Sequence, residues 1–153
     1  MSNAASPLDT LIDLARGARD NASLALANER QTERQVSDQL SSLTQYRLEY
    51  AQRLQGAMTE GIDPATLRNY QQFLYSLDAA IERARDALSA QQQQVSNRQS
   101  QWQQEERKLT SYDTLASRRQ AQQQQQDARK EMKINDDLVN GRLVRAKLSS
   151  ENS

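Results

Sequence analysis

The chain has 153 residues, with 20 Lys and Arg balanced by 20 Asp and Glu, and hydrophobic residues make up only 36% of it. A compact single-core domain is not expected, because so little apolar surface cannot offset the entropy lost on folding. The absence of Cys and His excludes disulfide frameworks, thiol and imidazole catalysis and the usual zinc sites, so we expect a non-enzyme without catalytic residues, cofactor or metal.

The balanced charge also argues against a nucleic-acid partner, which would favour an excess of Lys and Arg on one face. No stretch approaches the roughly 18 apolar residues of a membrane span, and the N-terminus lacks the pattern of a secretory signal. We therefore expect a cytoplasmic protein without a transmembrane segment.

A first helix is predicted over residues 8–58, after a disordered N-terminus of residues 1–7. Ser6-Pro7 is a helix start signal. Apolar residues then follow at spacings of three and four, which is typical of a coiled coil. The expected seam is Leu8, Leu11, Ala15, Ala18, Ala22, Ala25, Leu40, Leu43, Tyr50 and Leu54.

A turn over residues 59–63 and a second helix over residues 64–140 come next. Asp63 can cap a helix and Pro64 can occupy its first turn. A strict template of alternating three- and four-residue steps from Leu67 has twelve apolar residues at fifteen positions, which indicates a coiled coil. The fifteen are Leu67, Tyr70, Leu74, Leu77, Ile81, Ala84, Leu88, Gln91, Val95, Arg98, Trp102, Glu105, Leu109, Tyr112 and Ala116.

Two Gln runs, at residues 91–94 and 122–126, permit two interpretations. They could form a disordered tract, but their neighbours Arg, Glu, Ala and Leu favour the solvated face of a long helix.

A short loop between two long helices forces them to run antiparallel, with residue i opposite about residue 123 − i. The first helix then ends opposite about residue 115 of the second. The predicted fold is all-α, a long antiparallel two-helix coiled-coil hairpin whose second helix is longer and overhangs the first. Residues 141–153 are expected to form a flexible tail.

Several segments resemble the flagellar FliJ family, the small coiled coils of the bacterial flagellar type III export apparatus. They are Leu8-x-x-Leu11-x-x-Leu14-Ala15, Gln39-Leu40-x-x-Leu43-x-x-Tyr46-Arg47-x-Glu49-Tyr50, Gly61, Asn69-Tyr70-Gln71-Gln72-Phe73-x-x-x-Leu77-x-x-Ala80-Ile81, and Trp102 followed by Arg107-Lys108-Leu109. The resemblance covers roughly residues 8–140.

The resemblance implies a non-enzymatic coiled coil similar to the central stalk of rotary ATPases. Such a protein would bind the ring of the export ATPase (FliI), promote its assembly and activity, contact the cytoplasmic domain of the export gate (FlhA) and escort flagellar export chaperones. It would act in flagellum biogenesis, protein export, motility and chemotaxis. Its expected place is the cytoplasm, peripherally associated with the cytoplasmic face of the inner membrane at the flagellar base.

The resemblance also implies two contact sites. The gate contact comprises Gln39, Leu43, Tyr46, Tyr50, Phe73, Leu77, Ala80 and Ala84, and the ATPase-ring contact comprises Leu8, Leu11, Leu14, Ala15, Arg118 and Arg119. Ala84 departs from the family, because some members have a polar residue or His there. The predicted register places the gate residues at matching levels of the two helices. Phe73 lies outside the expected seam, so it should be partly exposed, as contact aromatics often are.

Other interpretations stay open at this point. The gate residues could simply be seam residues, and the charged residues at the far end could simply be solvated. The chain could be the equivalent stalk of a virulence type III secretion system. It could also be a scaffolding coiled coil that dimerises through its Gln-rich segment, or a chaperone that sequesters secreted substrates without acting on an ATPase.

Overall fold

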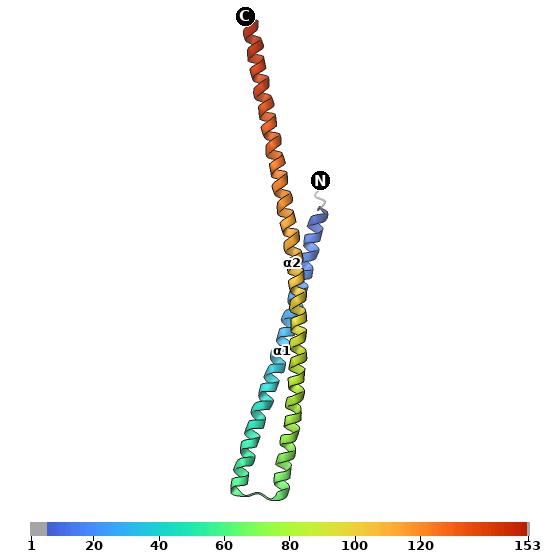
Figure 1. Ribbon diagram of the computed structural model, residues 1–153, viewed down its shortest axis with the longest axis vertical. Coiled ribbons are helices and arrows are strands. Elements are labelled where there is room, and N and C mark those ends of the chain that lie inside the picture. The colour runs from blue at the N-terminus through green and yellow to red at the C-terminus, as the bar shows by residue number, and fades with distance from the viewer. Residues whose placement is uncertain (1–5, 153) are drawn as a thin grey trace. The chain divides into compact units, whose positions relative to one another are not determined.

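The computed structural model describes residues 6–152, which form two long helices joined by a short turn (Figure 1). Helix α1 comprises Pro7–Glu60 and helix α2 comprises Pro64–Glu151. Between residues 6 and 152 there is no β-strand. The predicted fold class, an all-α hairpin of two packed helices with the second longer, is confirmed.

Helix α1 begins with a reciprocal cap. The Asp9 amide donates to Ser6 Oγ at 3.2 Å, and the Ser6 amide donates to Asp9 Oδ2 at 3.3 Å. This pairing satisfies amides that the first turn leaves without a helical partner, and Pro7 needs none because it lacks an N–H. The helix therefore starts at Pro7. Most of the segment expected to be disordered, residues 1–5, lies outside the described residues.

The turn contains only Gly61, Ile62 and Asp63, because α1 continues to Glu60. Gly61 has a φ of 91°, a left-handed conformation that glycine adopts without steric cost. Its amide donates to the Met58 carbonyl oxygen at 3.3 Å and so ends α1. The Thr66 amide donates to Asp63 Oδ2 at 3.3 Å, so Asp63 caps α2 as expected from the sequence.

The chain divides into two compact units. The first, here called the turn unit, comprises Ala15–Arg107 and contains the turn. The second, here called the terminal unit, comprises the chain up to Leu14 together with the chain from Lys108 onward. Within the turn unit the two helices run in opposite directions on either side of the turn (Figure 1).

Burial along α2 follows the predicted seam. All fifteen template positions from Leu67 to Ala116 are buried or half-buried, including the three polar positions Gln91, Arg98 and Glu105. Leu77, Ile81 and Leu109 are the most buried of them. A strict heptad repeat therefore defines the packed face of α2.

Burial along α1 corrects part of the predicted seam. Ile12, which is 9% exposed, takes the place expected for Leu11, which is 44% exposed. Leu26 is likewise buried where Ala25 was expected, and Ala25 is only half-buried. The reason is heptad phase, because the seam that contains Leu40, Leu43, Tyr50 and Leu54 leads back in steps of four and three to Leu26 and Ile12.

In the terminal unit, Leu8, Ile12 and Leu109 form the buried part. Every described residue of α2 from Ser117 onward is exposed. Helix α2 continues to Glu151, whereas a flexible tail was expected from Gly141. The second helix is thus longer than the sequence indicated, and its last third has no buried side chain.

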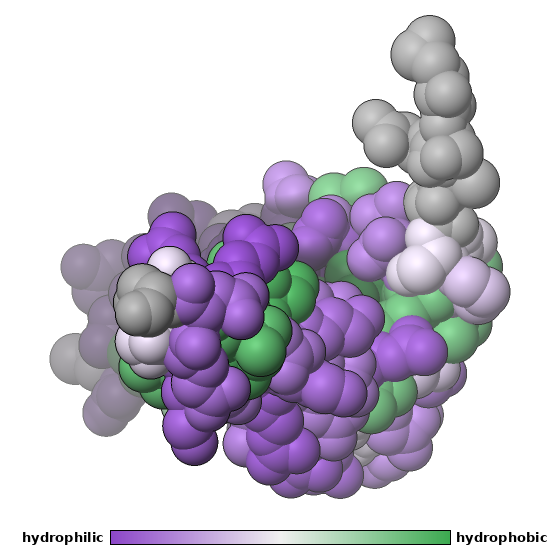
Figure 2. Space-filling model, turned by 90° about the horizontal axis from the view of Figure 1, so that it is seen from above, coloured by the Kyte–Doolittle hydropathy of each residue, from purple (hydrophilic) through white to green (hydrophobic). Residues whose placement is uncertain are grey.

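Seen from above, the surface is mainly hydrophilic, with hydrophobic residues in smaller patches between polar ones (Figure 2). Within residues 6–152, neither helix contains a stretch apolar and long enough to traverse a lipid bilayer.

Candidate partner-binding surfaces

The heptad pattern gives the turn unit two different long faces. We label heptad positions a to g so that Leu40 and Leu67 are at a, and Leu43 and Tyr70 are at d. Because the two helices are antiparallel, the g positions of both helices lie on one side of the seam. The e positions of both helices lie on the other side. We call the d and g positions the g face, and the a and e positions the e face.

All eight residues predicted for the gate contact lie on the g face of the turn unit. Four are at g and four are at d. The g residues are Gln39, Tyr46, Phe73 and Ala80, and the d residues are Leu43, Tyr50, Leu77 and Ala84.

An aromatic cluster joins the two helices on the g face near the turn. The Tyr50 ring lies 4.3 Å from the Phe73 ring and 5.2 Å from the Tyr70 ring, measured between centroids. The Tyr46 ring lies 6.1 Å from Phe73, edge to face, and 6.2 Å from Tyr50. These distances are typical of favourable aromatic pairs. Tyr70 belongs to this cluster, although the sequence indicated only a seam position for it.

The members of the predicted gate contact differ in how much they offer to a partner. Tyr46 is 45% exposed, and Phe73 is half-buried, as expected from its position beside the seam. Leu77 is only 7% exposed and belongs to the core. Tyr46 and Phe73 can therefore contact a partner directly, whereas Leu77 can act only by holding the helices together.

A groove continues the g face beyond the aromatic cluster, away from the turn. Its volume is about 360 Å³, and alanines form much of its wall on α2. Small side chains let another element approach a helix backbone closely. The lining residues are Val36, Gln39, Leu43, Ala80, Arg83, Ala84 and Ala87.

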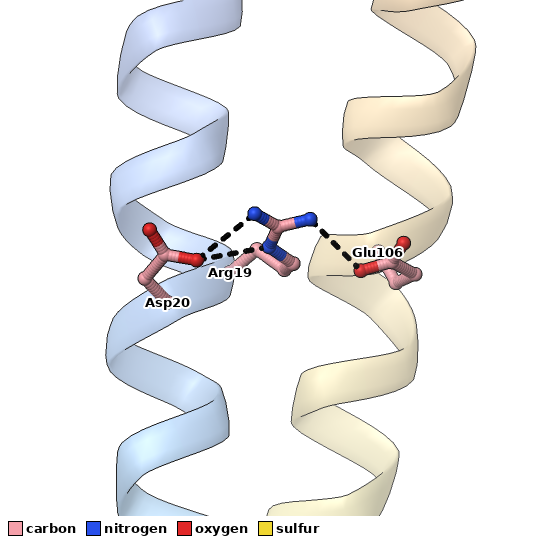
Figure 3. A network of polar contacts seen from close by, with 3 residues as sticks. All are labelled: Arg19, Asp20 and Glu106. Atoms are coloured by element: carbon pink, nitrogen blue, oxygen red, sulfur yellow. Dashed lines mark hydrogen bonds and ion pairs between the residues drawn. The ribbon is translucent and has the colours of Figure 1, made fainter.

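The e positions are mainly polar, and two ion pairs between the helices lie on this face. Arg47 Nη2 donates to Asp78 Oδ2 at 3.3 Å, and Arg47 Nε donates to Asp78 Oδ1. Mainly through this hydrogen bond, and also through its charge, Arg47 lowers the pKa of Asp78 below the ordinary 3.8. Farther from the turn, Arg19 bridges Asp20 of its own helix and Glu106 of α2, the latter at 3.7 Å (Figure 3).

The residues predicted for the ATPase-ring contact fall into two groups. Leu8 and Ala15 are buried, so they are packing residues. Leu11, Leu14, Arg118 and Arg119 are exposed and all belong to the terminal unit, whereas Ala15 belongs to the turn unit. The terminal unit therefore offers two leucines and two arginines to solvent.

Within the described part of the chain, no group of three or more acidic side chains is placed to hold a metal ion.

A helical hairpin whose seam is flanked by partly exposed aromatic rings on one side and by ion pairs on the other is a two-helix coiled coil. The sequence model of the family described as "FliJ: Flagellar FliJ protein" matches residues 4–148. The "Flagellar FliJ protein" of Salmonella typhi is 32% identical over 132 residues, which cover 86% of this chain and 90% of that protein. The "Flagellar FliJ protein" of Escherichia coli strain K12 is 30% identical over 132 residues, which again cover 86% of this chain and 90% of that protein. The chain belongs to the FliJ family, and it is accordingly a component of the flagellar protein export apparatus.

Proposed function

We propose that the chain is a stalk-like adaptor of the flagellar export apparatus, which binds the export gate through its turn unit and the export ATPase ring through its terminal unit. It promotes assembly and activity of the ATPase and has no catalytic activity of its own. It works at the cytoplasmic face of the inner membrane at the flagellar base, and it also receives export chaperones.

The g face is the observation that carries the gate contact. It brings all eight gate residues to one side of the turn unit, and it exposes part of the Tyr46 and Phe73 rings beside a shallow groove. Partly exposed aromatics next to small apolar residues are typical of interface hot spots. The e face has a groove of its own, lined by Tyr75, but its aromatic ring stands alone beside the Arg47–Asp78 ion pair.

Two variants, which lose aromatic side chains on different faces of the hairpin, test the gate contact. Tyr46→Ala together with Phe73→Ala should weaken binding to the purified cytoplasmic domain of the gate at least about tenfold in titration calorimetry. Tyr75→Ala is the matched control, because Tyr75 is 81% exposed and lines a groove on the e face with Arg47 and Asp78. Equal loss of binding in both variants, or loss of helicity in the first, would contradict the assignment of the g face.

The exposed leucines and arginines of the terminal unit support the ring contact. Leu11 and Leu14 leave much of their side chains open to solvent, and Arg side chains are suited to carboxylates on a partner. Leu11, Leu14, Arg118 and Arg119 supply both kinds of group within one unit.

The ring contact is tested by ATP hydrolysis of the flagellar ATPase titrated with this chain. Leu14→Ser combined with Arg118→Glu should reduce stimulation strongly and leave gate binding unchanged. Leu24→Ser is the control for loss of an exposed leucine, since Leu24 lies in the turn unit and outside the seam. If the unmodified chain does not stimulate hydrolysis or ring assembly, the stalk role is wrong and an escort role for chaperones is left.

A further inference from the structure

A further groove on the e face of the turn unit surrounds Trp102. Its volume is about 330 Å³, which is at the lower end of the range for ligand pockets and fits one large side chain better than a cofactor. Leu26 and Trp102 are seam residues at a positions, so they give the groove an apolar surface, and Trp102 is only half-buried. The lining residues are Ser23, Leu26, Ala27, Arg30, Gln99 and Trp102.

Two arginines mark the end of this groove that is nearer the turn. Arg30 lines the groove, and Arg34 follows it one helical turn later on the same side of α1. Both residues are exposed, and within residues 6–152 neither guanidinium takes part in a hydrogen bond or an ion pair. The groove therefore ends at two positive charges that are not directly paired within the described chain.

The neighbouring acidic residues do not supply the missing carboxylates. Glu29 and Glu33 are half-buried at seam positions, and Glu29 Oε2 accepts a hydrogen bond from Gln91 Nε2. Across the seam, α2 has no acidic residue between Asp86 and Glu105, a stretch that includes the first Gln run. Charge complementarity at this groove is therefore left to a partner that brings its own carboxylates.

We propose that this groove binds an acidic amphipathic helix of another protein, with one apolar side chain beside Trp102 and carboxylates against Arg30 and Arg34. An amphipathic helix commonly binds in a groove through apolar anchors spaced by about one turn, and Arg is suited to carboxylates. The inference goes beyond the proposed contacts with gate and ATPase, neither of which uses these residues.

The spacing of the groups on α1 defines the partner helix further. Arg30 and Arg34 come four and eight residues after Leu26, so all three lie along one side of α1 at steps of about 6 Å. A helix that lies alongside α1 has the same rise per residue. Its carboxylates should therefore lie about four and eight residues from its apolar anchor.

Trp102 reports on the groove directly, because it is the single Trp of the chain. The probe is a synthetic helical peptide without Trp, in which Glu residues stand four and eight positions from one Phe. Titrated into the full chain, it should move the Trp102 fluorescence to shorter wavelength as water leaves the ring, with a Kd below about 1 mM. Peptides with Gln for both Glu, or Ser for Phe, should each bind at least about tenfold more weakly.

A charge exchange tests the two arginines. Arg30→Glu combined with Arg34→Glu should weaken binding of the Glu peptide at least about tenfold, and a peptide with Lys at the two Glu positions should then bind this variant instead. Arg68→Glu is the control for loss of an exposed Arg near the turn, and it should leave binding of the Glu peptide unchanged.

Filling the groove tests the apolar anchor without removing a seam residue. Ser23→Leu places a larger side chain in the groove, and leucine favours a helix more than serine does, so binding should be lost while helicity is kept. Ser41→Leu makes the same change at an exposed position of α1 outside the groove, and it should bind the peptide normally.

Three results would overturn the proposal. They are the absence of a saturable fluorescence change up to about 1 mM peptide, equal binding of the Glu and Gln peptides, and unchanged binding in Ser23→Leu. Equal binding of the Phe and Ser peptides would also overturn it, because the arginines would then attract any polyanion, such as a nucleic acid, without use of the groove.

Discussion

Arg47 on α1 donates two hydrogen bonds to the carboxylate of Asp78 on α2, and a longer ion pair joins Arg19 to Glu106 in the same heptad positions. Both arginines are at a positions, and both acids are at e positions of the other helix. The two pairs are separated by a whole number of heptads on each helix. A long Arg side chain at the seam can therefore keep its stem among apolar residues while its charged end turns to the e face.

The Arg47–Asp78 pair predicts a pH dependence of stability. The pKa of Asp78 is lowered in the folded chain, mainly by the hydrogen bond from Arg47, so the pair contributes fully at pH above the unfolded pKa, which is about 3.9. The contribution is lost as pH falls through the folded value. The melting temperature, followed by circular dichroism, should therefore fall as the pH is lowered from about 6 to about 3. The melting temperature of the Asp78→Asn variant should fall less over the same range.

The control for this experiment is Asp86→Asn, which removes an exposed carboxylate of the same helix outside the seam. An equal change of slope in both variants would mean that general charge effects, and not the pair with Arg47, determine the acid response.

The turn predicts opposite effects for two glycine substitutions. Gly61→Ala should lower the free energy of unfolding by about 1–2 kcal/mol, because alanine in a left-handed conformation is strained. Gly61 has the required positive φ, whereas Gly56 is helical and has open space around its Cβ position. Gly56→Ala should therefore stabilise the chain by about 0.5–1 kcal/mol. Chemical unfolding of both variants measures the difference, and effects of the same sign would contradict this account of the turn.

The seam of α2 could be predicted from the sequence because its apolar residues keep one heptad phase over fifteen positions. The seam of α1 could not be fixed in the same way. Leu11 adjoins Ile12, and Ala25 adjoins Leu26, so each pair offers two phases. The heptad phase of Leu40 and Leu43, extended back along α1, selects Ile12 and Leu26, which are the buried members in the structure.

The candidate gate surface was predictable as a face but not residue by residue. The register from the turn already placed Tyr50 at the level of Phe73, and their rings are in contact in the structure. Exposure was predictable in part, because the heptad positions already placed Phe73 beside the seam and Leu77 within it. Leu77, a predicted contact residue, is therefore found in the core.

This placement of Leu77 predicts that any part it has in the proposed gate contact is indirect. Leu77→Ala should lower the free energy of unfolding by about 2–4 kcal/mol, since it removes a buried side chain. Leu48→Ala, at an exposed position, should change it by less than about 0.5 kcal/mol. Any loss of gate binding in Leu77→Ala should disappear at a temperature where the helicity of this variant equals that of the natural chain. Persistent loss at equal helicity would show that Leu77 contacts the gate directly.

The polar layer between Glu29 and Gln91 predicts a gain in stability when both residues are made apolar. Both are at d positions, and Gln91 Nε2 donates to the Glu29 carbonyl oxygen at 3.0 Å and to Glu29 Oε2 at 2.5 Å. Gln91→Leu alone should destabilise the chain by about 1–2 kcal/mol, because Glu29 loses its partner at a partly buried place. Glu29→Leu with Gln91→Leu should be more stable than the natural chain, since an apolar layer replaces polar groups in a heptad seam. Thermal unfolding of both variants checks the prediction. A double variant no more stable than Gln91→Leu would mean that the hydrogen bonds, and not the packing, hold this layer together.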